Sequence, residues 1–251
     1  MQKETTVFRS LLKACKTAAA VLTATALLTA CGETPAPPAY DYEIDMQKYQ
    51  AAIAVTDTAY LILVNKQNPC GESYLPQNLS PLPGDLTLYG KEISLDSNAA
   101  LAAEAMVREL RARGYGDIAV TSGYRSYAYQ QNLFNTYLGQ EKKAHPDWTQ
   151  AQCEAEVLTY SARPGTSEHQ TGLCLDLIST ENVVLDESFA QNPAYAWLTE
   201  NAHHFGFILR YPKDKEGVTG YSYEPWHYRF VGVEAATAIR EQGITLEEYL
   251  S

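Results

Sequence analysis

The chain has 251 residues, enough for one substantial domain, and 45% of them are hydrophobic, so it can bury an ordinary core. Its formal net charge is −11, from 19 Lys and Arg against 30 Asp and Glu. This acidic balance argues against a nucleic-acid-binding protein, which needs clustered cations, and against electrostatic adhesion to anionic lipid. Any attachment to a membrane must therefore be covalent or hydrophobic.

The first thirty residues have the order of charged and apolar residues that is typical of a secretory signal. Four cations within residues 1–16 precede an uncharged stretch over 17–30, which is shorter than the roughly 20 residues of a spanning helix. The stretch ends in Leu28-Thr29-Ala30-Cys31, which resembles a bacterial lipobox, where the cysteine is lipidated and becomes the new N-terminus. We therefore expect an extracytoplasmic lipoprotein, anchored to the bacterial cell membrane through Cys31. An uncleaved anchor helix, or an ordinary signal with a chance cysteine, is the alternative.

The rest of the chain divides into a tether and one domain. Residues 31–45 contain the lipidated cysteine and a proline-rich segment, which we expect to behave as an extended tether. We expect a single domain over 46–251. Its three cysteines, Cys70, Cys153 and Cys174, allow at most one disulfide, and their spacing does not select a pair.

Within the domain, the patterns predict short strands interleaved with helices. The predicted strands cover 59–65, 118–121, 173–177, 207–209 and 226–230. The predicted helices cover 99–113, 127–139, 148–161, 193–206 and 233–242, with Ser126 and Asp147 as N-caps of the second and third. Because the interleaving lacks the regular spacing of βαβ units, the fold class is α+β rather than a doubly wound sheet.

Two short segments contain residues suited to metal chemistry: Ser-Glu-His-Gln-Thr-Gly-Leu-Cys-Leu-Asp at 167–176, and Glu-Pro-Trp-His-Tyr-Arg at 224–229. A catalytic zinc site needs three protein ligands such as His and Asp, with one open position for water. A carboxylate beside the metal can then accept a proton from that water. From the residues alone, surface histidines and a hydrogen-bonded aspartate are the alternative interpretation. The helix-borne HExxH arrangement is absent from the sequence.

Taken together, Ser-x-His-x-x-Gly-x-x-x-Asp followed by Glu-x-x-His resembles the zinc D-alanyl-D-alanine carboxypeptidase family typified by VanY. The likeness extends to Ser-Gly-Tyr-Arg-Ser at 122–126 and to Arg-Tyr-Pro at 210–212, and it covers about 60–242. The resemblance implies an α+β fold shared with the hedgehog signalling domain, built on a small antiparallel sheet flanked by helices. It also implies one zinc ion and peptidoglycan stem peptides as substrate.

The resemblance assigns roles residue by residue. His169, Asp176 and His227 correspond to the zinc ligands. Glu224 corresponds to the catalytic base, and Arg125 to the arginine that faces the substrate near the scissile bond. Five further residues occupy matching positions around the cleft: Ser122, Tyr124, Gln130, Ser167 and Trp226. Cys174 falls on the same predicted strand face as Asp176, where it is either a small buried thiol or a fourth metal ligand.

The expected activity is therefore release of the terminal D-alanine from stem peptides by a metal-activated water. Glu224 would take the water proton and return it to the leaving amine, while Arg125 would stabilise the oxyanion or bind the terminal carboxylate. Cleavage of the L,D-bond of tetrapeptide stems is the nearest alternative. A non-catalytic cell-wall-binding lipoprotein is a further alternative, and the sequence does not set the oligomeric state.

Overall fold

The computed structural model describes residues 40–251. The predicted signal over 1–30 and the predicted lipidation site Cys31 lie outside the described residues. One compact unit spans Tyr40–Ser251, so it begins before the expected domain start at residue 46. The physical reason is that the alternating side chains of Tyr40, Tyr42 and Ile44 pack against the hydrophobic core.

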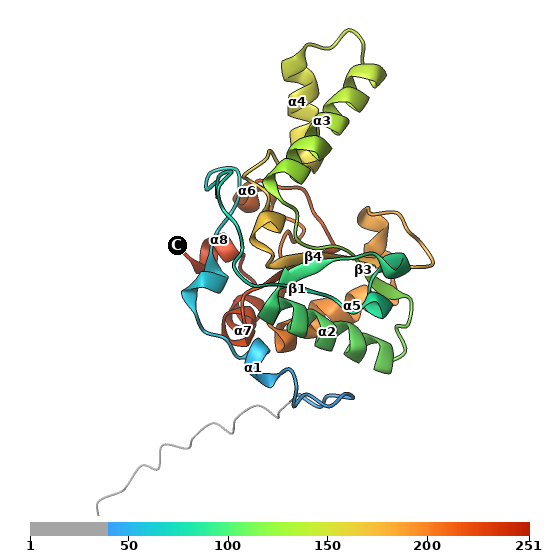
Figure 1. The fold of residues 1–251 in the computed structure, drawn as a ribbon, viewed down its shortest axis with the longest axis vertical. Helices are drawn as coiled ribbons and strands as arrows, with labels where there is room; N and C mark the ends of the chain where they lie inside the picture. The colour runs from blue at the N-terminus through green and yellow to red at the C-terminus, as the bar shows by residue number, and fades with distance from the viewer. Residues whose placement is uncertain (1–39) are drawn as a thin grey trace, which may run out of the picture. The chain divides into compact units, whose positions relative to one another are not determined.

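Two antiparallel sheets form the centre of this unit (Figure 1). The larger sheet has the strand order β3-β4-β6-β5, and all of its neighbouring pairs are antiparallel. Its strands are β3 (Ile118–Ser122), β4 (Cys174–Ser179), β5 (Phe207–Leu209) and β6 (His227–Phe230). The smaller sheet pairs β1 (Leu79–Pro81) with β2 (Ser94–Asp96). The predicted α+β fold with a small antiparallel sheet is confirmed.

Helices surround the sheets, and the α3–α4 pair projects from the rest of the unit (Figure 1). The α-helices are α1 (Gln50–Ile53), α2 (Ser97–Ala112), α3 (Tyr127–Ala144), α4 (Gln150–Tyr160), α5 (Pro193–Asn201), α6 (Glu216–Thr219), α7 (Val233–Gln242) and α8 (Leu246–Tyr249). Short 3₁₀ turns lie between them, among them η1 (Thr58–Leu61), η4 (Glu168–Thr171) and η6 (Ala202–Phe205). Within residues 40–251, no helix has the length and apolarity needed to cross a membrane.

The larger sheet has one apolar face and one polar face. Leu175 and Leu177 of β4 point to the same side as Tyr228 and Phe230 of β6, and all four belong to the core cluster that contains α2. The opposite side of the same strands carries Cys174, Asp176, His227 and Arg229. Every residue of β4 is buried, because polar side chains cover its second face. This polar layer positions the candidate site.

Two local predictions are wrong. Residues 59–65 do not form a strand: Asp57 caps the 3₁₀ turn η1, and the carbonyl oxygens of Tyr60 and Ile62 accept hydrogen bonds from Arg229 instead of a neighbouring strand. The helix predicted over 148–161 begins at Gln150, because Thr149 forms a capping box with Gln152 and takes the place expected for Asp147.

Candidate active site

His169 is fixed by a tight turn and a backbone hydrogen bond. It lies in η4, which ends at Gly172 with φ +73°, a left-handed conformation that favours glycine. A Cβ at Gly172 would also lie 3.1 Å from the backbone nitrogen of Asp96. The Nδ1 of His169 lies 2.6 Å from the carbonyl oxygen of Gly123. Because that carbonyl can only accept, Nδ1 carries the proton, and the lone pair of Nε2 is free to bind a metal.

Asp176 and His227 face each other across the β4–β6 pair. Their Cα atoms are partners in the antiparallel register, so both side chains point to the polar face of the sheet. Asp176 Oδ1 lies 3.1 Å from His227 Nδ1, and Asp176 Oδ2 lies 3.3 Å from His169 Nε2. The structure therefore brings together the three predicted ligands, although the two histidines are 58 positions apart in the sequence.

These three side chains fit a bound metal ion. Two zinc–ligand bonds of about 2.0–2.2 Å at a tetrahedral angle place their donor atoms roughly 3.3–3.6 Å apart, close to the observed spacings. Asp176 Oδ1 is buried and makes no hydrogen bond within residues 40–251, as expected of an oxygen reserved for a metal. Burial raises the pKa of Asp176, but the two imidazoles outweigh burial and hold that pKa well below its usual range.

Glu224 lies beside the three candidate ligands without being one of them. Its Oε2 is 3.5 Å from His227 Nδ1, and its side chain is 17% exposed in the cleft. Two backbone hydrogen bonds fix its position: its N–H donates to Tyr211, and its carbonyl oxygen accepts from His227. Burial raises the pKa of Glu224 to about 7, although the imidazole of His227 acts to lower that pKa. A carboxyl group with such a pKa can both accept and return a proton near neutral pH.

A cleft of about 440 Å³ opens above the three candidate ligands. Arg125 lines it, and its backbone N–H donates to the carbonyl oxygen of His169, which fixes the arginine close to the ligands. Arg125 thus brings a positive charge to the cleft, and its Nε is buried without a hydrogen-bond partner among the described residues. Ser167 and Trp226 also line the cleft, as expected of substrate-contacting residues.

Three other predicted substrate contacts do not line the cleft: Ser122, Tyr124 and Gln130. Gln130 is 1% exposed, and its Nε2 donates to the carbonyl oxygen of Ala162 and to Ser161, so it supports the cleft wall from behind. Ser122 belongs to β3, where it pairs with Asp176. The backbone of Tyr124 is held by a hydrogen bond from its N–H to Ser94 of β2.

Sequence reasoning missed a buried charge cluster behind His227. Glu168 Oε1 accepts hydrogen bonds from Arg210 Nε and Arg229 Nη1, each at 2.7 Å, and all three side chains are fully buried. Glu168 Oε2 lies 3.5 Å from His227 Nε2. Burial raises the pKa of Glu168, but the two guanidinium groups outweigh burial and lower that pKa. The carboxylate thus faces the ring nitrogen remote from the candidate metal position, the usual arrangement around a ligating histidine.

Glu247 completes this cluster from the far end of the chain. Its carboxylate accepts two hydrogen bonds from Arg210, at 2.8 and 2.6 Å. Two cations therefore balance two anions, and only the Glu247 side chain is partly exposed, at 14%. The local signal for this cluster was the Glu within the Ser-x-His motif, but its partners are 42 and 61 residues away in the sequence.

The cysteines behave as three separate thiols. Cys70, Cys153 and Cys174 are all free, so no disulfide forms among the described residues. Burial raises the pKa of Cys174, but the imidazoles of His169 and His227 outweigh burial and lower that pKa to about 7. Cys174 therefore forms a thiolate, the form of cysteine that binds metal ions, more readily than an ordinary cysteine does.

The part of the chain that contains this site matches a known protein family. The family model described as "VanY: D-alanyl-D-alanine carboxypeptidase" matches residues 92–233, more than half of the chain. The chain belongs to the VanY family. A D-alanyl-D-alanine carboxypeptidase of Enterococcus faecalis is 43% identical over 191 residues, which is 76% of this chain and 65% of the relative. The alignment thus spans slightly less than two thirds of that VanY-family relative.

Solved structures of other peptidases show a similar fold. The LdcB LD-carboxypeptidase has a TM-score of 0.66 and 38% identity, covering 76% of this chain and 85% of that chain. A mutant of the vancomycin-resistance D,D-pentapeptidase VanY, solved in complex with Zn(II), has a TM-score of 0.63 and 39% identity, covering 77% of this chain and 99% of that chain. Both likenesses confirm the predicted hedgehog-like peptidase fold.

Proposed function

We propose that this protein is a zinc-dependent carboxypeptidase that hydrolyses the terminal D-alanine from peptidoglycan stem peptides. One observation carries the proposal: His169, Asp176 and His227 surround a single point at the floor of a cleft, with Glu224 beside it. The family relatives support the substrate class, because one solved VanY-family structure contains D-alanine-D-alanine, and another contains Zn(II).

In this proposal His169 Nε2, the Asp176 carboxylate and His227 Nδ1 hold one zinc ion. A zinc ion held by three protein ligands supplies a Lewis acid that makes water nucleophilic near neutral pH. The hydrogen bond between His169 Nδ1 and the Gly123 carbonyl, and the contact between His227 Nε2 and Glu168, aim the correct nitrogen of each ring at the ion.

Glu224 takes the proton from the attacking water and returns it to the leaving amine. Its oxygen lies on the cleft side of His227, within reach of a water positioned between the ligands and the substrate. Arg125 lines the cleft and supplies a positive charge there, although the protein as a whole is acidic. Its guanidinium can bind the terminal carboxylate of the substrate or stabilise the developing oxyanion.

L,D-carboxypeptidase activity on tetrapeptide stems is the second candidate, because the structurally similar LdcB is an LD-carboxypeptidase. Incubating the zinc-loaded protein with pentapeptide and tetrapeptide stems separates the two candidates. Loss of one alanine mass from the pentapeptide alone supports D,D-specificity, and loss from the tetrapeptide alone supports L,D-specificity. No release from either stem would contradict both, and would leave a wall-binding role.

We further propose that Cys31 is lipidated and anchors the protein to the outer face of the bacterial cell membrane. The support is the sequence alone: a short apolar stretch that ends in a lipobox-like Leu-Thr-Ala-Cys. Two acyl chains on one cysteine are enough for stable anchoring. Replacing Cys31 by serine should release the protein from the membrane fraction of cells, and retention there would contradict the lipid anchor.

A further inference from the structure

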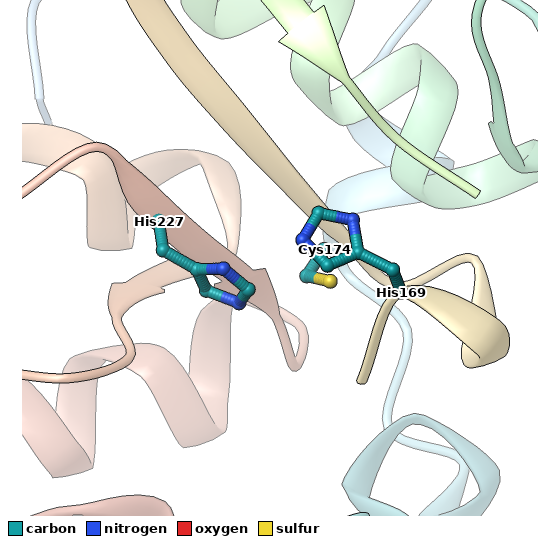
Figure 2. A group of neighbouring side chains, drawn as sticks. All are labelled: His169, Cys174 and His227. Carbon is teal, nitrogen blue, oxygen red and sulfur yellow. The ribbon is translucent and has the colours of Figure 1, made fainter. Parts of the chain in front are cut away.

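A sulfur atom lies next to the two imidazoles of the candidate site. His169, Cys174 and His227 each offer one donor atom, and these atoms all lie within 4.8 Å of one another. Their exposed fractions are 2%, 0% and 3%. Figure 2 shows the three side chains converging from three elements: His169 from η4, Cys174 from β4 and His227 from β6.

The register of the sheet explains why Cys174 points there. Cys174 precedes Asp176 by two residues on β4, so both side chains project from the same face of the strand. Asp176 pairs with His227, and Cys174 pairs with Arg229, the next residue on that face of β6. The two imidazoles therefore have two different donors from one strand within reach, a carboxylate and a sulfur.

These two donors prefer different metal ions. A carboxylate is a hard ligand, whereas a thiolate is soft and favours thiophilic ions. We propose that the imidazoles of His169 and His227 serve two overlapping ligand sets, and that Cys174 completes a second, His–Cys–His set for divalent ions softer than zinc. On binding, the Cys174 thiol releases its proton to solvent, and a sulfur–metal bond forms.

This site does not rest on the proposed carboxypeptidase activity, because it needs only the two imidazoles and the sulfur. It predicts that the metal selectivity of the protein depends on Cys174, while zinc binding depends on Asp176. It also predicts that thiophilic ions compete with zinc, because the two sets share both histidines.

Cadmium binding to the full chain tests the proposal. Cys15, Cys31 and Cys70 are first replaced by serine, so that Cys174 and the buried Cys153 are the remaining thiols. The metal-free protein is titrated with Cd²⁺, and sulfur-to-cadmium charge transfer is followed by ultraviolet difference absorption. Affinities for Cd²⁺ and Zn²⁺ are measured by competition with a chelator.

The parent protein should show the charge-transfer band, and Cys174→Ala should lose it. The same variant should lose about tenfold or more in Cd²⁺ affinity, with a much smaller change for Zn²⁺. Cys153→Ala, which removes a buried thiol from α4, is the matched control and should keep the band. Asp176→Asn should weaken Zn²⁺ binding and also keep the band.

Several results would overturn the proposal: a band that persists in Cys174→Ala, an unchanged Cd²⁺ affinity, or equal losses for the two ions. Circular dichroism checks the fold of each variant, and Cys174→Ser provides a second substitution of similar size. A protein that shows the band but releases no D-alanine would contradict the proposed function and leave the thiophilic site intact.

Discussion

Replacing Glu168 by glutamine removes a negative charge that two fully buried arginines share. Arg210 would keep its bidentate pairing with Glu247. Arg229 would keep only backbone carbonyl oxygens, such as those of Tyr60 and Ile62. The variant therefore leaves one buried guanidinium without a counter-charge.

The size of the effect follows from burial. Removing one partner of a fully buried ion pair costs about 3–5 kcal/mol of unfolding free energy, because the remaining charge stays out of water. The substitution also weakens the acceptor that faces His227 Nε2. Loss of such a contact to a ligating histidine lowers metal affinity about 10–100-fold. We expect both losses in Glu168→Gln.

Urea unfolding with linear extrapolation, in the presence of a chelator, measures the stability loss without the contribution of bound metal. Zn²⁺ affinity is measured separately by chelator competition. Glu104→Gln is the matched control, because Glu104 pairs with Lys48 and Arg108, whose side chains are 58% and 37% exposed. Water can solvate those cations, so we expect a cost of about 1 kcal/mol or less. Equal stability losses in the two variants, or unchanged Zn²⁺ affinity in Glu168→Gln, would refute the reasoning.

Three further predictions concern single side chains. Glu224→Gln should retain zinc but release D-alanine about 10²–10⁴-fold more slowly by product mass, and near-normal turnover would remove Glu224 from the mechanism. Arg125→Ala should lower the hydrolysis rate about 10²–10³-fold in the same assay, and an unchanged rate would exclude a role in charge stabilisation. Burial lowers the pKa of His204 from 6.5 to about 4, so stability should fall as pH drops through that window, because the unfolded chain binds the proton first. His204→Phe, which keeps a ring against Tyr40, should flatten this decline in urea unfolding at pH 7 and 5; equal declines would contradict it.

Elements with a strong local signal could be predicted from the sequence. The helix predicted over 99–113 is α2 (Ser97–Ala112), and the segments predicted at 207–209 and 233–242 match β5 and α7. The predictions fail where tertiary contacts, rather than local sequence, determine the secondary structure. At 59–65, β-forming residues are held in a 3₁₀ turn and a loop, because Arg229 takes the carbonyl oxygens that a strand would offer to its neighbour.

The residues of the site also fall into those that a local motif predicts and those that only tertiary contacts bring together. The motifs identified the three candidate ligands and Glu224, because each motif is a short continuous segment. The first joins His169 in η4 to Asp176 in β4, and the second joins Glu224 to His227 at the start of β6. The charge cluster of Glu168, Arg210 and Arg229 could not be predicted, because it assembles only when η4 and the β5–β6 end of the sheet meet. The position of Gln130 behind the cleft wall is a similar case, since its partners follow α4.

Anomalous X-ray diffraction from zinc-loaded crystals tests the central claim most directly. We predict one ion in the cleft, about 2.0–2.2 Å from His169 Nε2, a carboxylate oxygen of Asp176 and His227 Nδ1, with Glu224 outside bonding distance. An ion bound elsewhere, or coordinated by Glu224 in place of one of these three residues, would contradict the account.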